Sequence, residues 1–241
     1  MAGPAHPRIG SPCRWVAQDL SRVKRPPDPG VLLVFEGIDG VGKSTQIRAV
    51  SEALRVLGIE VVASKEPTDG PFGRRLRASA TTGRLDPAEE LELFMADRRE
   101  HVARLILPSL ARGAVVILDR YYFSTAAYQG ARGLSWEAIL AANEEFAPEP
   151  DLLVWLDLPP EASMERIRAR GDGANEFERA NLLEASRRIF ASILKPYLRR
   201  MDATQSVEAI RDTVVGEVRQ LLGARGLHAD GRKPTDTRAS I

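Results

Sequence analysis

Eight consecutive residues of this chain have the types and the spacing of a phosphate-binding loop. Residues 37–44 read GIDGVGKS, which fits the pattern G-x-x-x-x-G-K-[ST]. Glycines let the backbone curl so that successive N–H groups point at phosphate oxygens, and a helix beginning near Lys43 would add its positive N-terminal end. Lys43 would bring a full charge to the β- and γ-phosphates, and Ser44 would offer a hydroxyl to Mg²⁺. The pattern therefore predicts a site for a nucleoside triphosphate and its magnesium ion.

Two other residues, which come later in the chain, have side chains that suit the same site. Asp119 ends the apolar run from Ala114 to Leu118, which is the position of an aspartate that holds Mg²⁺ directly or through water. Arg120 follows it, and arginine is suited to bidentate contacts with phosphate. We therefore expect a second phosphate group at Arg120, with Arg98 as another candidate.

The elements that must position these residues alternate between strands and helices. Val31 to Phe35 is a continuous apolar run, typical of a strand buried on both faces, and apolar residues at helical spacing follow the loop as far as Gly58. Further strands are expected at 59–63, 114–118, 152–158 and 201–203, and further helices after the N-caps Asp86 and Ser206 and at 136–146, 161–170 and 176–197. This alternation implies a parallel sheet covered on both faces, with ligands beyond the carboxyl ends of the strands.

The composition of the chain argues against several classes of function, and its two ends differ in character from the middle. The 241 residues include 34 basic and 33 acidic ones, and a net charge of +1 does not suggest a nucleic-acid-binding surface. No apolar run reaches the ~20 residues needed to cross a bilayer. The single cysteine, Cys13, favours a reducing, cytoplasmic setting. We expect residues 1–29 to be a disordered extension, residues 30–223 the folded domain and residues 224–241 a disordered tail.

Three classes of protein use such a loop: kinases, GTPase-like switches and nucleotide-binding proteins without catalysis. A guanine-reading switch would need an N-K-x-D segment, but the chain has no Asn-Lys pair, and no D-x-x-G follows at Asp119. The three histidines, His6, His101 and His228, lie in no strand-end motif, which would be awkward for a hydrolase that needs a general base. A phosphate acceptor needs no such base, because a phosphate monoester has a second pKa of about 6. The pattern favours a kinase that acts on a monophosphate.

Six segments resemble one family, in order and at fitting intervals. They are FEGIDGVGKST at 35–45, KEP at 65–67, LFMADR at 93–98, DRYYFSTAAYQG at 119–130, PDLLVWLD at 150–157 and DATQS at 202–206. Together they resemble the thymidylate kinase family of nucleoside monophosphate kinases. The resemblance implies a three-layer α/β P-loop kinase fold, with a parallel sheet of about five strands and a short lid. It also implies transfer of the γ-phosphoryl group of ATP to dTMP, with Mg²⁺, by a homodimer that pairs through helices near Phe94.

The resemblance assigns roles to individual residues. ATP would contact Gly37, Ile38, Asp39, Gly40, Val41, Gly42, Lys43, Ser44 and Thr45, and Mg²⁺ would contact Ser44 and Asp119. The acceptor would contact Asp39 at its 3′-hydroxyl, Pro67, Phe94 stacked on thymine, Arg98 at O4, Arg120 at the phosphate, Thr125 near N3 and Tyr128 against the 2′ position. The catalytic residues would be Lys43, Arg120, Arg168 and Arg170.

Two segments depart from the family pattern. The expected lid, with Arg168 and Arg170, is short, and residues 176–178 read EFE where the family often has an arginine first. Residues 66–70 read EPTDG where the family has EPGGT, so Asp69 would add negative charge near the acceptor. A changed acceptor pocket would favour another monophosphate, such as dUMP. A disabled lid would favour a nucleotide-binding protein without catalysis.

Overall fold

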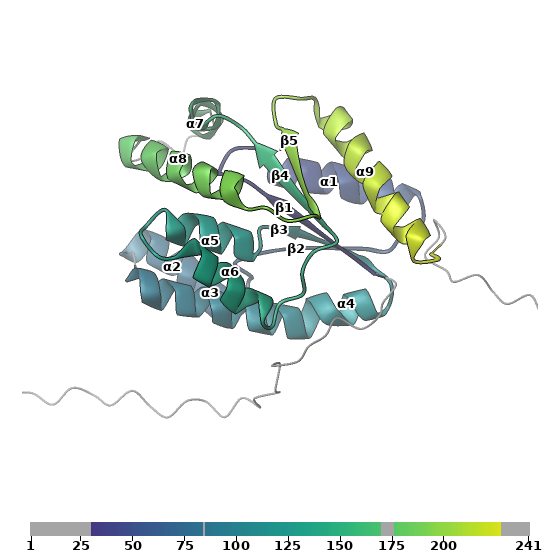
Figure 1. Cartoon of the computed structure of the whole chain (residues 1–241), viewed down its shortest axis with the longest axis horizontal. Coiled ribbons are helices and arrows are strands. Elements are labelled where there is room, and N and C mark those ends of the chain that lie inside the picture. Colours follow the sequence, from purple (N-terminus) through teal and green to yellow (C-terminus); the bar gives the residue numbers. More distant parts are fainter. Residues whose placement is uncertain (1–29, 84, 170–175, 228–241) are drawn as a thin grey trace, which may run out of the picture.

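The computed structural model describes residues 30–83, 85–169 and 176–227. Within them, five parallel strands form one sheet in the order β2-β3-β1-β4-β5 (Figure 1). The strands are β1 Val31–Glu36, β2 Val61–Lys65, β3 Val115–Asp119, β4 Leu152–Asp157 and β5 Leu198–Asp202. The expected α/β fold with a parallel sheet is therefore confirmed.

The pairing of the strands brings the chemistry-bearing segments together. All six residues of β1 are buried, since this strand lies at the centre of the sheet with helices on both faces. Phe35 of β1 and Lys65 of β2 both pair with Asp119 of β3. The strands thus end at one level, and the segments that follow them share one edge of the sheet.

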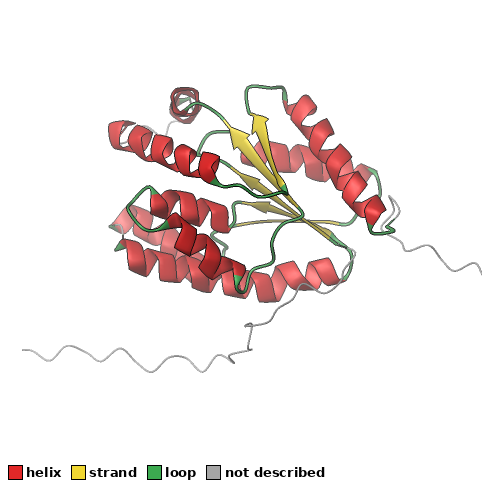
Figure 2. Cartoon of the chain, in the orientation of Figure 1, coloured by secondary structure: helices red, strands yellow, loops and turns green. Residues whose placement is uncertain are grey.

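Helices cover both faces of the sheet, which gives three layers (Figure 2). One face packs against α1 Lys43–Val56 and α9 Val207–Ala224. The other face packs against α3 Pro87–His101, the π-helical η1 Val102–Ile106, α4 Leu107–Ala111, α5 Tyr122–Gly130, α6 Trp136–Glu144 and α8 Glu176–Ser192. Two further helices, α2 Pro71–Thr82 and α7 Pro160–Arg168, complete the described part. None of the described helices is long and apolar enough to cross a bilayer.

Several element boundaries differ from those expected. Helix α2 was not anticipated from the sequence, and α8 ends at Ser192 rather than near Tyr197, because Pro196 disfavours helical backbone at the residue before it. Strand β2 begins at Val61 rather than Ile59. Strand β5 begins at Leu198 rather than Met201, and its exposed arginines broke the apolar pattern.

The folded part also continues past the expected boundary at residue 223. Helix α9 ends at Ala224, and Arg225 forms an ion pair with Asp151 at the start of β4. Arg225 also donates to the carbonyl of Gly30, and Leu227 is only 7% exposed. The segment 224–227 is therefore part of the domain rather than of a tail.

Candidate active site

The loop expected to bind phosphate joins β1 to α1. Gly40 and Gly42 have φ angles of 81° and 100°, in the left-handed region that glycine adopts without strain. A side chain at position 40 would also meet the carbonyl oxygen of Ser163 in α7, at 2.8 Å. The side chains of Ile38 and Val41 are buried in the core beneath the loop. These two residues therefore offer a ligand mainly their backbone.

Lys43 opens α1 and folds its side chain back over the loop. Its Nζ donates to the carbonyls of Gly37, at 3.0 Å, and Ile38, at 2.9 Å. Burial lowers the pKa of Lys43 to about 8, and the neighbouring Arg120 acts in the same direction, against Asp39 and Asp119. The ammonium group is thus held at the loop with little hydration of its own.

The two residues expected to hold the metal lie together. The Ser44 hydroxyl donates to Asp119 Oδ2 at 2.7 Å. A hydroxyl and a carboxylate are oxygen donors of the kind that Mg²⁺ prefers, and Mg²⁺ in such sites takes its remaining ligands from phosphates and water. The pair therefore fits a magnesium ion that is bound together with a nucleotide.

Arg120 follows β3 and lies between the loop and α5. Its backbone has a φ of 70°, and its N–H donates to the carbonyl of Phe35 at 3.0 Å. The guanidinium group forms an ion pair with Asp39, donates to Ser124 Oγ at 2.8 Å and lies 5.2 Å from the centre of the Tyr128 ring. Arg120 is thereby held at the junction of β1, β3 and α5.

Glu36 supports this junction, although sequence analysis gave it no role. Its buried carboxylate accepts hydrogen bonds from the N–H groups of Tyr121, at 2.7 Å, and Ser124, at 3.0 Å. Burial raises the pKa of the Glu36 carboxyl above its ordinary value, although Arg120 and Ser124 oppose this. The carboxylate lies at the N-terminal end of α5, where the helix dipole favours negative charge. An acidic residue that closes an apolar strand was the available signal.

Two pockets meet at Asp39 and Arg120. The first lies over the loop and is lined by Asp39, Gly40, Gly42, Lys43, Ser44, Thr45, Asp119 and Arg120. The second is lined by Asp39, Glu66, Pro67, Glu90, Phe94, Arg98, Arg120, Tyr121, Ser124, Thr125, Tyr128 and Gln129. Every residue expected to contact the acceptor lies in the second pocket.

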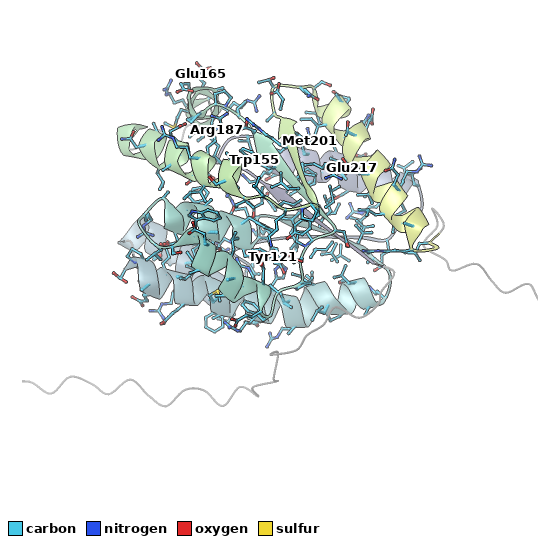
Figure 3. The ribbon with its side chains drawn as sticks, viewed as in Figure 1. Tyr121, Trp155, Glu165, Arg187, Met201 and Glu217 are labelled. Carbon is cyan, nitrogen blue, oxygen red and sulfur yellow. The ribbon has the colours of Figure 1, made fainter. Side chains whose placement is uncertain are left out.

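The floor of the second pocket is polar and fully buried. Arg98 is 0% exposed and forms an ion pair with Glu66, with 2.7 Å between Nη2 and Oε2. The ring of Tyr121, labelled in Figure 3, lies 5.5 Å from the Arg98 guanidinium. A planar ligand in this pocket would meet the Phe94 ring and a fixed cation.

Comparisons with known proteins agree with this arrangement. The family model described as "Thymidylate kinase" matches residues 35–214. A "Thymidylate kinase" of Xanthomonas campestris pv. campestris (strain B100) is 49% identical over 208 residues, covering 85% of this chain and 91% of the relative. A "Thymidylate kinase" of Akkermansia muciniphila is 54% identical over 196 residues, covering 81% of this chain and 93% of the relative.

The chain belongs to the thymidylate kinase family. This membership confirms the family and the enzyme class, a phosphotransferase, that were expected from the sequence.

Only part of the family's lid lies among the described residues. Arg168 is the exposed last residue of α7, whereas Arg170 lies outside the described residues, as do the side chains at 176–178. Arg166, one turn before Arg170, donates to the carbonyls of Val41, at 3.3 Å, and Ala203, at 3.2 Å. Helix α7 is therefore bonded directly to the phosphate-binding loop.

The unusual segment EPTDG leaves the acceptor pocket without the extra negative charge that was expected. Asp69 is exposed, pairs with Arg77 at 2.8 Å and Lys65 at 3.5 Å, and does not line the acceptor pocket. Thr68 instead anchors the segment, because its N–H and hydroxyl both donate to Asp97, at 2.7 and 2.6 Å. The expectation for Asp69 was wrong, since neighbouring cations and solvent surround its carboxylate.

Proposed function

We propose that this kinase transfers the γ-phosphoryl group of ATP to dTMP, yielding dTDP and ADP. The observation that carries the proposal is the meeting of the two pockets at Asp39 and Arg120. Phosphoryl transfer requires the donor and acceptor phosphates in line and close together, and most of the catalysis comes from positioning and charge. A loop pocket that opens beside a pocket for a planar base supplies this geometry.

The donor side would work through backbone amides and one ammonium group. Residues 37–45 would surround the phosphates, and Lys43 would leave the carbonyls of Gly37 and Ile38 to contact the β- and γ-phosphates. Ser44 and Asp119 would hold Mg²⁺, which would neutralise charge on the phosphate oxygens. Arg168 and Arg170 would approach the transferred group from the lid.

The acceptor side would bind the base, the sugar and the phosphate separately. Phe94 would stack on thymine, Arg98 would donate to O4, and Thr125 would lie near N3, with Pro67 on the pocket wall. Asp39 would accept from the 3′-hydroxyl, and Tyr128 would crowd the 2′ position. Arg120 would hold the acceptor phosphate, whose oxygen is ionised and needs no general base.

We also propose that the kinase is a homodimer. An apolar hollow between α3 and α6 is lined by Leu91, Met95, Leu134, Ser135, Ala138, Ile139 and Ala142. Helix α3 thus presents Leu91 and Met95 to this hollow and Phe94 to the acceptor pocket. A second copy that covers the hollow would remove this apolar surface from water.

The test is an ADP-release assay with ATP and Mg²⁺, in which dTMP, dUMP, UMP, CMP, AMP and GMP are offered one at a time. We expect clear preference for dTMP. Faster turnover of another monophosphate would overturn the substrate and keep the kinase. Folded protein that binds ATP and turns over no acceptor would overturn the proposal.

A further inference from the structure

Three protein side chains surround the guanidinium group of Arg98, and Glu66 Oε2 lies close to two of its nitrogens, at 2.8 Å from Nε and 2.7 Å from Nη2. Nε donates to Glu66 Oε2 at 2.8 Å, and Nη2 donates to Thr125 Oγ1 at 3.0 Å. Nη1 donates to the side-chain oxygen of Asn143 at 2.5 Å. Because these three acceptors surround a planar group, they fix both its position and the direction of its plane.

Asn143 differs from the other two acceptors because it does not line the acceptor pocket. It lies in the last turn of α6 and is 0% exposed. Its Nδ2 donates to the carbonyl of Ile139 at 2.7 Å, so its oxygen is turned toward Arg98. Both ends of the side-chain amide are therefore satisfied, and Arg98 is the partner of its oxygen.

The opposite side of Arg98 is anchored to the sheet. Glu66, which follows β2, lies with its Oε1 3.0 Å from His101 Nδ1, and His101 Nε2 lies 2.9 Å from Ser64 Oγ. This chain of contacts holds the Glu66 carboxylate, and with it Nε of Arg98. Asn143 is the only acceptor for Nη1 among the hydrogen bonds of the described residues. Without it, Glu66 and Thr125 would still hold Nε and Nη2, but the Nη1 end of the guanidinium group would have no acceptor to fix its direction.

We propose that Asn143 is a positioning residue that orients Arg98 and so sets the choice of base. Arginine only donates hydrogen bonds, so an oriented Arg98 favours a pyrimidine with an acceptor oxygen at position 4 over one with an amino group there. Discrimination of this kind is strong, because the wrong base leaves buried donors unpaired. The inference rests on the proposed function, in which Arg98 contacts the base.

Helix α6 would then influence the acceptor pocket without lining it, because its Asn143 contacts Arg98, which does line the pocket. Helices α3, α5 and α6 lie together on one face of the sheet (Figure 1), and α5 contacts both of the others. Arg98 comes from α3, Thr125 from α5 and Asn143 from α6. The orientation of one guanidinium group thus depends on the packing of three helices.

The experiment compares the parent enzyme with Asn143→Leu, which keeps most of the volume and removes the acceptor, and with Asn143→Asp, which keeps an acceptor oxygen. We expect Asn143→Leu to raise the KM for dTMP by up to about tenfold, because a misdirected Arg98 would weaken its own charged hydrogen bond to the base. Its KM for ATP should stay within about twofold of the parent value, and its kcat/KM ratio of dTMP to dCMP should fall. Asn143→Asp should restore most of the preference for dTMP.

Glu145→Ala is the matched control, because Glu145 is an exposed residue at the same end of α6. If Asn143→Leu does not fold, Asn143→Ala carries the same test. An unchanged KM for dTMP and an unchanged base preference in a folded variant would overturn the inference. A parallel rise in the KM values for dTMP and ATP would also overturn it, because that result indicates a general structural role.

Calorimetric titration with dTMP separates this inference from the proposed function. A parent enzyme that binds dTMP without phosphorylating it would overturn the proposed function alone. The dissociation constants of the variants for dTMP and dCMP would then still test Asn143. A parent enzyme that does not bind dTMP would overturn both.

Discussion

Asp39 and Arg120 form an ion pair, and both residues line both pockets of the site. Asp39 comes from the loop after β1 and Arg120 from the end of β3, so the pair joins two neighbouring strands at the place where two phosphates would meet. The carboxylate holds a cation in place before any phosphate arrives. An incoming acceptor phosphate would compete with Asp39 for this guanidinium group, which leaves Asp39 available to the sugar.

The planar guanidinium group of Arg120, with its two donating nitrogens, should contribute more to activity than its positive charge alone. Arg120→Lys keeps a cation but loses the planar group that contacts both Asp39 and Ser124. We expect kcat/KM for dTMP to fall by about 100-fold or more in steady-state assays. Arg112→Lys is the control, because Arg112 is exposed and pairs with Glu60 away from the site. Activity of Arg120→Lys near that of the parent would show that Arg120 has no bidentate role.

Affinity for ATP should depend on pH through Lys43. The pKa of Lys43 is lowered to about 8 in the free protein, chiefly by burial. Only the protonated form attracts phosphates, so affinity should be flat between about pH 7 and this pH, where the phosphates stay ionised, and fall by up to about tenfold per pH unit above it. Calorimetric titration across this range measures the slope. Lys43→Arg should remove the slope, since a guanidinium group stays charged; an equal slope in both proteins would assign it to another group.

Tyr128 should have two separable roles. Its hydroxyl accepts from the N–H of Asp39 at 3.1 Å, while its ring lies against Arg120. Tyr128→Phe should keep the preference for deoxyribose and raise the KM for ATP by about threefold, the value of one hydrogen bond. Tyr128→Ala should also raise kcat/KM for UMP relative to kcat/KM for dUMP. If the ratio of kcat/KM for UMP to that for dUMP does not change in Tyr128→Ala, Tyr128 does not contact the 2′ position of the sugar.

The charge of Asp69 should not affect the acceptor. Because its carboxylate is exposed and pairs with Arg77 and Lys65, Asp69→Gly should leave the KM for dTMP within about twofold of the parent value. Asp97→Asn is the contrasting change, since Asp97 is buried and accepts both bonds from Thr68. A larger effect on KM from Asp69→Gly than from Asp97→Asn would contradict this assignment.

The residues after α9 should contribute to stability. A chain that ends at Gly223 loses the ion pair of Arg225 with Asp151 and the buried Leu227. Burial of one leucine side chain stabilises by about 1.5–3 kcal/mol. We therefore expect a loss of about 5 °C or more in Tm relative to a chain that ends at Leu227. Equal Tm values for the two chains in calorimetric scans would show that residues 224–227 do not stabilise the domain.

The sequence predicted the parts whose structure depends on local pattern. Strands β1, β3 and β4 have unbroken apolar runs because both of their faces are buried, and the phosphate-binding loop requires glycines at fixed spacing. The start of β5 was missed, since Arg199 and Arg200 lie exposed within it. Helix α2 was missed as well, although Pro71 at its start is a usual signal.

The contacts that hold the site residues in position could not be predicted from local pattern. Asn143 lies 45 positions from Arg98 along the chain, and no spacing rule connects them. Glu66 was noted only as part of a family motif, yet its carboxylate contacts both Arg98 and His101. Such roles depend on which elements meet in space. They become visible only when the helices are docked on the sheet.

The network around Arg98 joins β2, α3, α5 and α6 through the side chains of Glu66, Arg98, Thr125 and Asn143. A chain in which any of these elements is undocked has no complete site for the base, so the acceptor would bind the native state and not the unfolded one. By mass action, such a ligand at about 100 times its Kd stabilises the fold by about 2.7 kcal/mol. In a cell, the abundance of this enzyme would then rise and fall with the supply of its own substrate, because occupied molecules unfold less often and are degraded less often.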